Sequence, residues 1–112
     1  MQRCGSVIEV KPGKLEEYKR LHAAAWPGVL RMIKACNIAN YSIYLRKFPD
    51  GRHYLFSYFE YTGGDFAADM ARMAADPETQ RWWAVCEPCH EPFADRAPDE
   101  WWAGMEEVFH LD

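Results

Sequence analysis

Three side chains with complementary chemistry recur at every fourth position of the sequence, namely Tyr18, His22 and Trp26. Residues four apart lie on the same face of an α-helix, one turn above each other. Imidazole is the side chain best suited to transferring protons near neutral pH. The spacing therefore predicts an acid–base group on a helix, with two flat rings beside it that could enclose a small ring-shaped ligand.

Two further aromatic features extend this surface. Trp82 and Trp83 are adjacent, and neighbouring helical residues point about 100° apart, so we expect one in the core and the other against a ligand. Indole faces stack on the C–H-rich faces of sugars, and the indole N–H is a donor. Tyr41 alternates with Ile43 and Leu45 in a strand-like segment and is expected to face the helices.

His22 also admits a purely structural interpretation, as a half-buried histidine bonded to a carbonyl or to Tyr18. An ionisable group on an apolar helix face costs free energy unless something satisfies it, and such groups gather at functional sites. No acidic residue lies one turn away on the same face, and Ser42 and Ser57 lack the nucleophile-elbow pattern. General acid–base catalysis by His22, aided by a phenol, is the predicted chemistry.

A second motif, Cys86-Glu-Pro-Cys89-His90, matches the pattern for covalent haem attachment. A zinc site would need a fourth ligand such as His110, and no second ligand pair follows at a regular spacing. A redox pair normally opens a helix, whereas this motif closes one. We therefore interpret these cysteines as thiols near a helix end and expect no metal and no cofactor.

Composition narrows the class of protein. The chain has 112 residues, the size of one domain, which we assign to residues 1–112. A net charge of −4 disfavours nucleic acid and anionic membranes as partners. No apolar run approaches the roughly 20 residues of a membrane span, and the first residues lack a signal-peptide stretch. We expect a cytoplasmic protein with reduced cysteines.

Hydrophobic periodicity predicts the order β-α-β-β-α-β, the ferredoxin-like α+β arrangement. Proline at position 27 must kink or restart the first helix. Helices would cover only one face of this sheet, so we expect a homodimer that covers the other. The predicted elements are a strand Cys4–Val10, a helix from Leu15 to Ile33, strands Asn40–Phe48 and His53–Tyr61, helices Asp65–Ala75 and onward from Asp76-Pro77, a loop Glu91–Asp99 and a strand Met105–Leu111.

Four blocks, in order along nearly the whole chain, resemble the L-rhamnose mutarotase family. They are Tyr18-x-x-x-His22-x-x-x-Trp26-Pro27, Asn40-Tyr41-Ser42-Ile43-Tyr44-Leu45, Gln80-Arg81-Trp82-Trp83 and Glu106-Glu107-Val108-Phe109-His110-Leu111. The resemblance implies a dimeric α+β barrel of ferredoxin-like type that interconverts the α and β anomers of L-rhamnose without a cofactor.

The resemblance also implies roles for individual residues. His22 would be the catalytic proton donor, and substrate binding would fall to Tyr18, Tyr41, Trp82 and Trp83. The chain departs from the family pattern in the cysteine- and proline-rich segment after the tryptophan pair, and in a histidine at position 110 where the family has tyrosine.

The expected function is therefore that of an isomerase acting on L-rhamnose or a related 6-deoxyhexose monosaccharide. Two alternatives come from other classes of protein. One is a monooxygenase-like enzyme on the same dimeric barrel, which would bind a coloured or aromatic substrate. The other is a noncatalytic sugar-binding module, which would bind rhamnose and leave anomer exchange unchanged.

Overall fold

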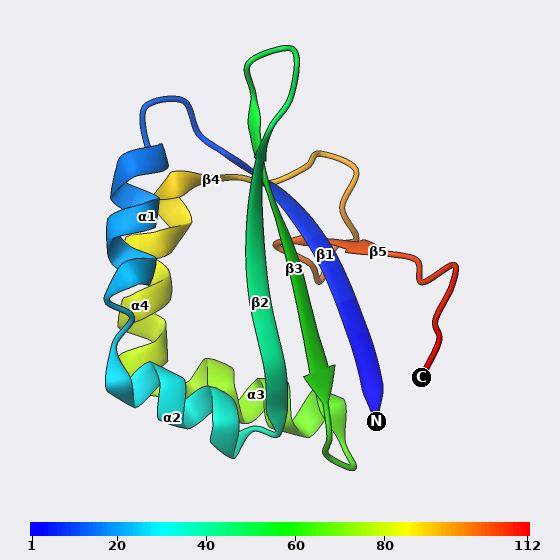
Figure 1. Ribbon diagram of the computed structural model, residues 1–112. Coiled ribbons are helices and arrows are strands. Elements are labelled where there is room, and N and C mark those ends of the chain that lie inside the picture. Colours follow the sequence, from blue (N-terminus) through cyan, green and yellow to red (C-terminus); the bar gives the residue numbers. More distant parts are fainter.

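In the computed structural model, which describes residues 1–112, the strands form one antiparallel sheet (Figure 1). The central strand β1 (Gln2–Val10) pairs on one side with β3 (His53–Tyr61), and β3 pairs with β2 (Ile38–Lys47). The other side of β1 pairs with β4 (His90–Glu91) and β5 (Ala103–Met105). The order β2-β3-β1-β4 confirms the predicted ferredoxin-like α+β fold.

All four helices lie on the same side of this sheet (Figure 1). The first crossover contains α1 (Leu15–Ala23) and α2 (Pro27–Ala35), and the second contains α3 (Phe66–Ala75), α4 (Pro77–Cys86) and the short 3₁₀ helix η1 (Glu87–Cys89). None of these helices combines the length and hydropathy needed to cross a membrane.

Proline at position 27 restarts the helix instead of bending it. Pro27 is the first residue of α2, the position where a missing N–H removes no helical hydrogen bond. Trp26 takes the N-cap position in an extended conformation. Of the two predicted outcomes, a kink or a restart, the structure shows the restart, with the segment 24–26 between the two helices.

Aspartates begin both helices of the second crossover, as their positions in the sequence indicate. The Asp65 carboxylate accepts from the Ala68 N–H at 3.1 Å. Asp76 ends α3 and caps α4, and one of its oxygens accepts from both the backbone N–H (2.9 Å) and the hydroxyl (2.8 Å) of Thr79. These contacts satisfy donors that a helix N-terminus leaves free.

The strand face toward the helices follows the predicted alternation, with Ile8 opposite Leu55 and Leu55 opposite Leu45. Packing against the helices divides the core into three clusters. They contain Ile8, Val10, Tyr18, Leu55 and Cys89 in the first, Cys36, Ile38, Tyr61 and Met73 in the second, and Val29, Trp82 and Cys86 in the third. Tyr18 and Trp82, two residues of the expected site, are therefore also core residues.

A bulge interrupts the pairing of β2 with β3. Ala39 pairs with Glu60 and Ser42 with Tyr58, so Asn40 and Tyr41 together face a single residue of β3. Asn40 adopts a positive φ of 50°, which asparagine tolerates better than most residues. A bulge re-aims the side chains around it, and here it leaves Tyr41 on the same face as the buried core residues of β2 and β3.

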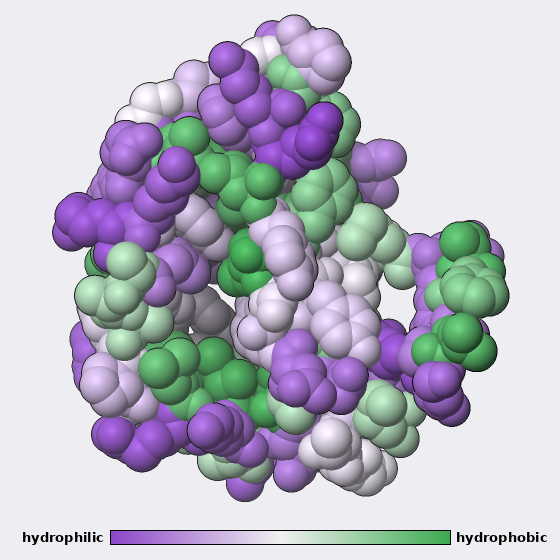
Figure 2. Space-filling view, viewed as in Figure 1, coloured by the Kyte–Doolittle hydropathy of each residue, from purple (hydrophilic) through white to green (hydrophobic).

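The predicted final strand Met105–Leu111 is wrong in its bounds. The strand β5 covers Ala103–Met105, and residues 106–112 form an arm without regular structure. Arg3 and Glu107 form an ion pair of 2.9 Å, but no ladder continues. The arm stands apart from the body with exposed apolar side chains (Figure 2). Alternation alone does not make a strand where no neighbouring backbone is available to pair with it.

Candidate active site

A continuous line of rings joins α1 to α4. The rings of Tyr18 and His22 stack with centroids 4.0 Å apart. The imidazole of His22 meets the edge of Trp82 at 5.2 Å, and Trp82 meets Trp26 at 5.2 Å. His22 and Trp26 therefore share Trp82 as a partner, and Tyr18 joins the line through His22, although a helix break separates Trp26 from the other two.

His22 has one ring nitrogen engaged and one free. Its Nδ1 lies 3.0 Å from the backbone carbonyl oxygen of Tyr18, and because a carbonyl only accepts, Nδ1 carries the proton. Nε2 is then the atom available for proton transfer. Burial lowers the pKa of His22 below its ordinary value of 6.5, and the bond to the Tyr18 carbonyl offsets part of this change. At neutral pH the imidazole is uncharged.

An open cavity of about 280 Å³ lies beside this imidazole. Its lining includes Tyr18 and His22 from α1, and Ile43, Leu45 and Leu55 from the sheet. Ligand pockets span roughly 300–1,000 Å³, so this cavity suits a small molecule. The mixture of apolar walls with one phenol, one imidazole and the Lys19 side chain fits a ligand that has both apolar and hydroxyl-bearing faces.

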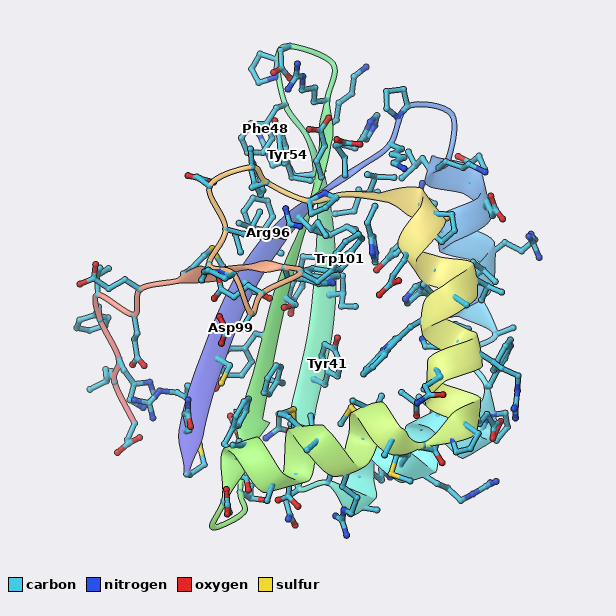
Figure 3. All side chains as sticks on the ribbon, turned by 180° about the vertical axis from the view of Figure 1, so that it is seen from behind. Tyr41, Phe48, Tyr54, Arg96, Asp99 and Trp101 are labelled. Atoms are coloured by element: carbon cyan, nitrogen blue, oxygen red, sulfur yellow. The ribbon has the colours of Figure 1, made fainter.

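Tyr41 lies on β2 near the same space (Figure 3). Its ring meets Phe59 edge-on at 5.6 Å. Although 44% of Tyr41 is exposed, burial raises the pKa of its phenol, and the nearby Cys86 thiol adds to the rise. Burial also raises the pKa of Tyr18, with a further contribution from Tyr41. Both phenols therefore stay protonated at neutral pH and serve as hydrogen-bonding groups, not as bases.

The tryptophan pair divides as its spacing predicts. Trp82 is 7% exposed and packs with Val29 and Cys86 in the third core cluster. Trp83 is 37% exposed and makes no ring contact with the other site residues. One indole thus closes the site from within, and the other remains available on the surface of α4.

Three residues of the Cys86-x-x-Cys89-His90 motif are buried, namely both cysteines and the histidine. The cysteines are free thiols at the ends of α4 and η1, the helix-end position expected from the sequence. No group of three or more His, Cys, Asp or Glu side chains is placed to hold a metal ion. Burial raises the pKa of Cys86 to about 12. His110 lies on the C-terminal arm, where its Nε2 is 2.7 Å from Asp112.

The residue that sequence reasoning missed is His90. Its ring lies 5.6 Å from that of Tyr18 and 5.5 Å from that of Trp102. Its Nδ1 accepts a hydrogen bond of 3.1 Å from the indole Nε1–H of Trp101. The motif drew attention to His90 as a ligand, but only the pairing of β4 with the end of β1 brings it next to α1.

Solved structures share this architecture. A crystal structure of L-rhamnose mutarotase from Formosa agariphila matches with a TM-score of 0.74 at 20% identity, and the match covers all of both chains. A type-II polyketide cyclase from Streptomyces glaucescens matches with a TM-score of 0.70 at 12% identity over 100% of this chain and 98% of the cyclase. At these identities the likeness shows the fold alone.

The sequence comparisons are more specific. The family model described as L-rhamnose mutarotase matches residues 3–111. L-rhamnose mutarotases from Opitutus terrae and Bacillus subtilis are 37% and 35% identical to this chain, over all of both sequences in each case. An L-rhamnose mutarotase from Listeria monocytogenes is 33% identical over 99% of both sequences. This chain therefore belongs to the L-rhamnose mutarotase family.

Proposed function

We propose that the protein interconverts the α and β anomers of L-rhamnose or a related 6-deoxyhexose. The observation that carries the proposal is an uncharged imidazole whose Nε2 is free beside a small cavity. Family membership and the relatives named above support it. A sugar of this class has hydroxyls for the phenols and a methyl-bearing face for the apolar walls.

Anomers interconvert by opening the ring and closing it on the other face of the carbonyl. The neutral Nε2 of His22 accepts the proton of the anomeric hydroxyl, and the imidazolium then delivers it to the ring oxygen as the bond from that oxygen to C1 breaks. Rotation about C1–C2 exposes the other carbonyl face, and the same steps run in reverse. Both oxygens are attached to C1, so one group can serve both. Proton transfer of this kind typically contributes 10²–10⁴-fold.

The remaining predicted residues bind the sugar or, in the case of Trp82, hold His22 in place in this proposal. Tyr18 and Tyr41 stay protonated and donate hydrogen bonds to sugar hydroxyls. Trp82 holds the imidazole from the side, and Trp83 offers an indole face to the C–H-rich side of the sugar. The two phenols orient the ring so that its two C1-bound oxygens face His22.

Exchange spectroscopy of the two anomer resonances tests the activity, with L-rhamnose as substrate and L-fucose and D-glucose as comparison sugars. We expect faster exchange of L-rhamnose with the wild type and only the spontaneous rate with His22→Ala. Equal acceleration by both proteins would remove His22 from the mechanism. Binding of L-rhamnose without acceleration would favour a noncatalytic sugar-binding module.

We further propose that the protein is a homodimer joined through the sheet face that the helices leave uncovered. Tyr44, which is exposed, and Phe56 are paired across β2 and β3 on that face. Phe48 and Tyr54 meet at its hairpin end with ring centroids 4.6 Å apart (Figure 3). Light scattering coupled to size-exclusion chromatography should give twice the chain mass of 13.1 kDa, and Tyr44→Glu should shift the mass toward the monomer.

A further inference from the structure

His90 is a buried imidazole that the proposed reaction does not use. It is 6% exposed, and the indole N–H of Trp101 donates to its Nδ1. A neutral imidazole that accepts at Nδ1 carries its proton on Nε2. That Nε2–H is a buried donor with no hydrogen-bond partner, and buried donors are rarely left without one.

The neighbouring Tyr18 also has a buried polar atom without a hydrogen-bond partner, in this case an oxygen that can accept. Its residue is 4% exposed, and its hydroxyl is likewise buried without a partner. The rings of Tyr18 and His90 are 5.6 Å apart and tilted by 55°. Two neighbouring rings therefore each carry a buried polar atom without a partner, one an N–H donor and the other a phenol oxygen with two lone pairs to accept with.

We propose that His90 positions Tyr18 for the sugar: in the ligand-bound protein, the Nε2–H of His90 donates to the Tyr18 hydroxyl oxygen, and that hydroxyl donates its own hydrogen to a sugar hydroxyl. This rests on the proposed function and adds a residue to it. Once the phenol oxygen accepts from His90, the single hydrogen of the phenol points away from that bond. Tyr18 then presents a directed donor where it lines the cavity.

The loop between β4 and β5 is built to hold this arrangement in place. The Arg96 side chain donates to the backbone carbonyls of Glu100 (2.8 Å) and Phe93 (2.9 Å). Its guanidinium also lies over the Trp101 ring, 5.6 Å from the centroid, and Figure 3 shows both residues on this loop. Because the loop is bonded within itself, the indole N–H reaches His90 from a defined position and fixes its tautomer.

The first test is a double-mutant cycle measured by anomer exchange of L-rhamnose. We expect His90→Leu to lower kcat/KM about five- to tenfold, the usual worth of one hydrogen bond. His90→Gln should restore most of the loss because its amide keeps a donor. In a Tyr18→Phe background, His90→Leu should have no further effect. His53→Leu, at the outer end of β3, is the matched control and should leave the rate unchanged.

The outcomes separate this inference from the proposed function. If the wild type does not accelerate exchange, the function is wrong. If it does and His90→Leu matches it, or if the loss is equally large in Tyr18→Phe, the role of His90 is overturned. Trp101→Phe covers the case in which His90→Leu fails to fold: it removes the indole N–H that donates to His90 and keeps an aromatic ring at the position, and an unchanged kcat/KM would overturn the role.

A measurement that does not depend on turnover uses nitrogen-15 NMR of the histidine side chains. Adding L-rhamnose should shift the His90 Nε2–H proton downfield in the wild type and leave it in place in Tyr18→Phe. A resonance that does not move in the wild type when L-rhamnose binds would also overturn the proposal. A histidine that merely fills the core would give no such difference between the two proteins.

Discussion

The side chain of His22 donates a hydrogen bond to the backbone carbonyl of Tyr18, one helical turn earlier, at 3.0 Å. The contact joins a candidate catalytic group to the residue that carries a candidate binding group. It holds the imidazole through Nδ1 and leaves Nε2 without a protein partner on a residue that lines the cavity. Because the carbonyl belongs to the backbone, substitution of the Tyr18 side chain leaves this anchor in place.

The pH dependence of exchange should follow the neutral form of His22. Burial lowers its pKa below 6.5, so kcat/KM for L-rhamnose should be level at and above neutral pH and fall as the pH drops through the lowered pKa. Exchange spectroscopy from pH 4 to 8, corrected for the spontaneous rate, measures the profile. A rate that instead rises on acidification would show that the imidazolium is the resting form.

The stability of the fold should depend on His90 in mildly acidic solution. Burial lowers its pKa from 6.5 to about 4, and the nearby His22 adds to the effect. Between these values the unfolded chain binds a proton that the folded protein does not, so stability falls as the pH falls. The full loss is about 3 kcal/mol at 1.36 kcal/mol per pKa unit.

Urea unfolding of wild type and His90→Gln from pH 8 to pH 4 isolates this contribution, since other groups titrate in both proteins. The difference in unfolding free energy between the two proteins should be constant above pH 7 and change in favour of the variant below it. Parallel curves throughout would contradict the assignment.

The adjacent tryptophans should separate stability from binding. Trp82→Ala removes a core residue and should cost about 3–5 kcal/mol. Trp83→Ala, on the surface of α4, should cost about 1 kcal/mol or less and raise KM for L-rhamnose. Thermal unfolding and sugar titration followed by NMR provide the two measurements. A Trp83→Ala protein with unchanged KM would exclude that indole from the binding surface.

The two capping aspartates give a matched pair. Asp76→Ala removes both bonds to the buried Thr79 and should cost about 1–2 kcal/mol. Asp65→Ala should cost about 1 kcal/mol. Because α4 carries Trp82 and α3 carries no proposed site residue, the Asp76 variant should also lower the exchange rate. Equal effects of both variants on exchange would show that the α4 cap does not support the site.

Local patterns in the sequence were sufficient for the order of elements and for the aromatic residues on α1 and α4. The contact between Trp82 and His22 comes from the structure and was not predicted. Sequence patterns did not predict the features that depend on which strands pair in the folded protein. The alternation from Met105 to Leu111 is real, yet no strand of the chain pairs with it beyond Met105. The contact between His90 and Tyr18 depends on a two-residue strand, which is too short to leave a periodic signal.

The bulge at Asn40 and Tyr41 marks the same limit. A strict alternation through the segment would put Ile38 and Tyr41 on opposite faces, but the extra residue puts both toward the helices. Its trace in the sequence is an asparagine, which adopts a positive φ more readily than most residues. An asparagine alone does not predict which residues of the partner strand lie opposite the bulge.

Each of the three core clusters contains one buried cysteine, namely Cys89, Cys36 and Cys86 in turn. Alkylating reagents attack the thiolate of an accessible cysteine, so a buried thiol reacts only when its surroundings open. The chain thus carries a natural chemical label in every packed unit. Labelling rates read residue by residue would rank the order in which the three parts of the core loosen, without any engineered probe.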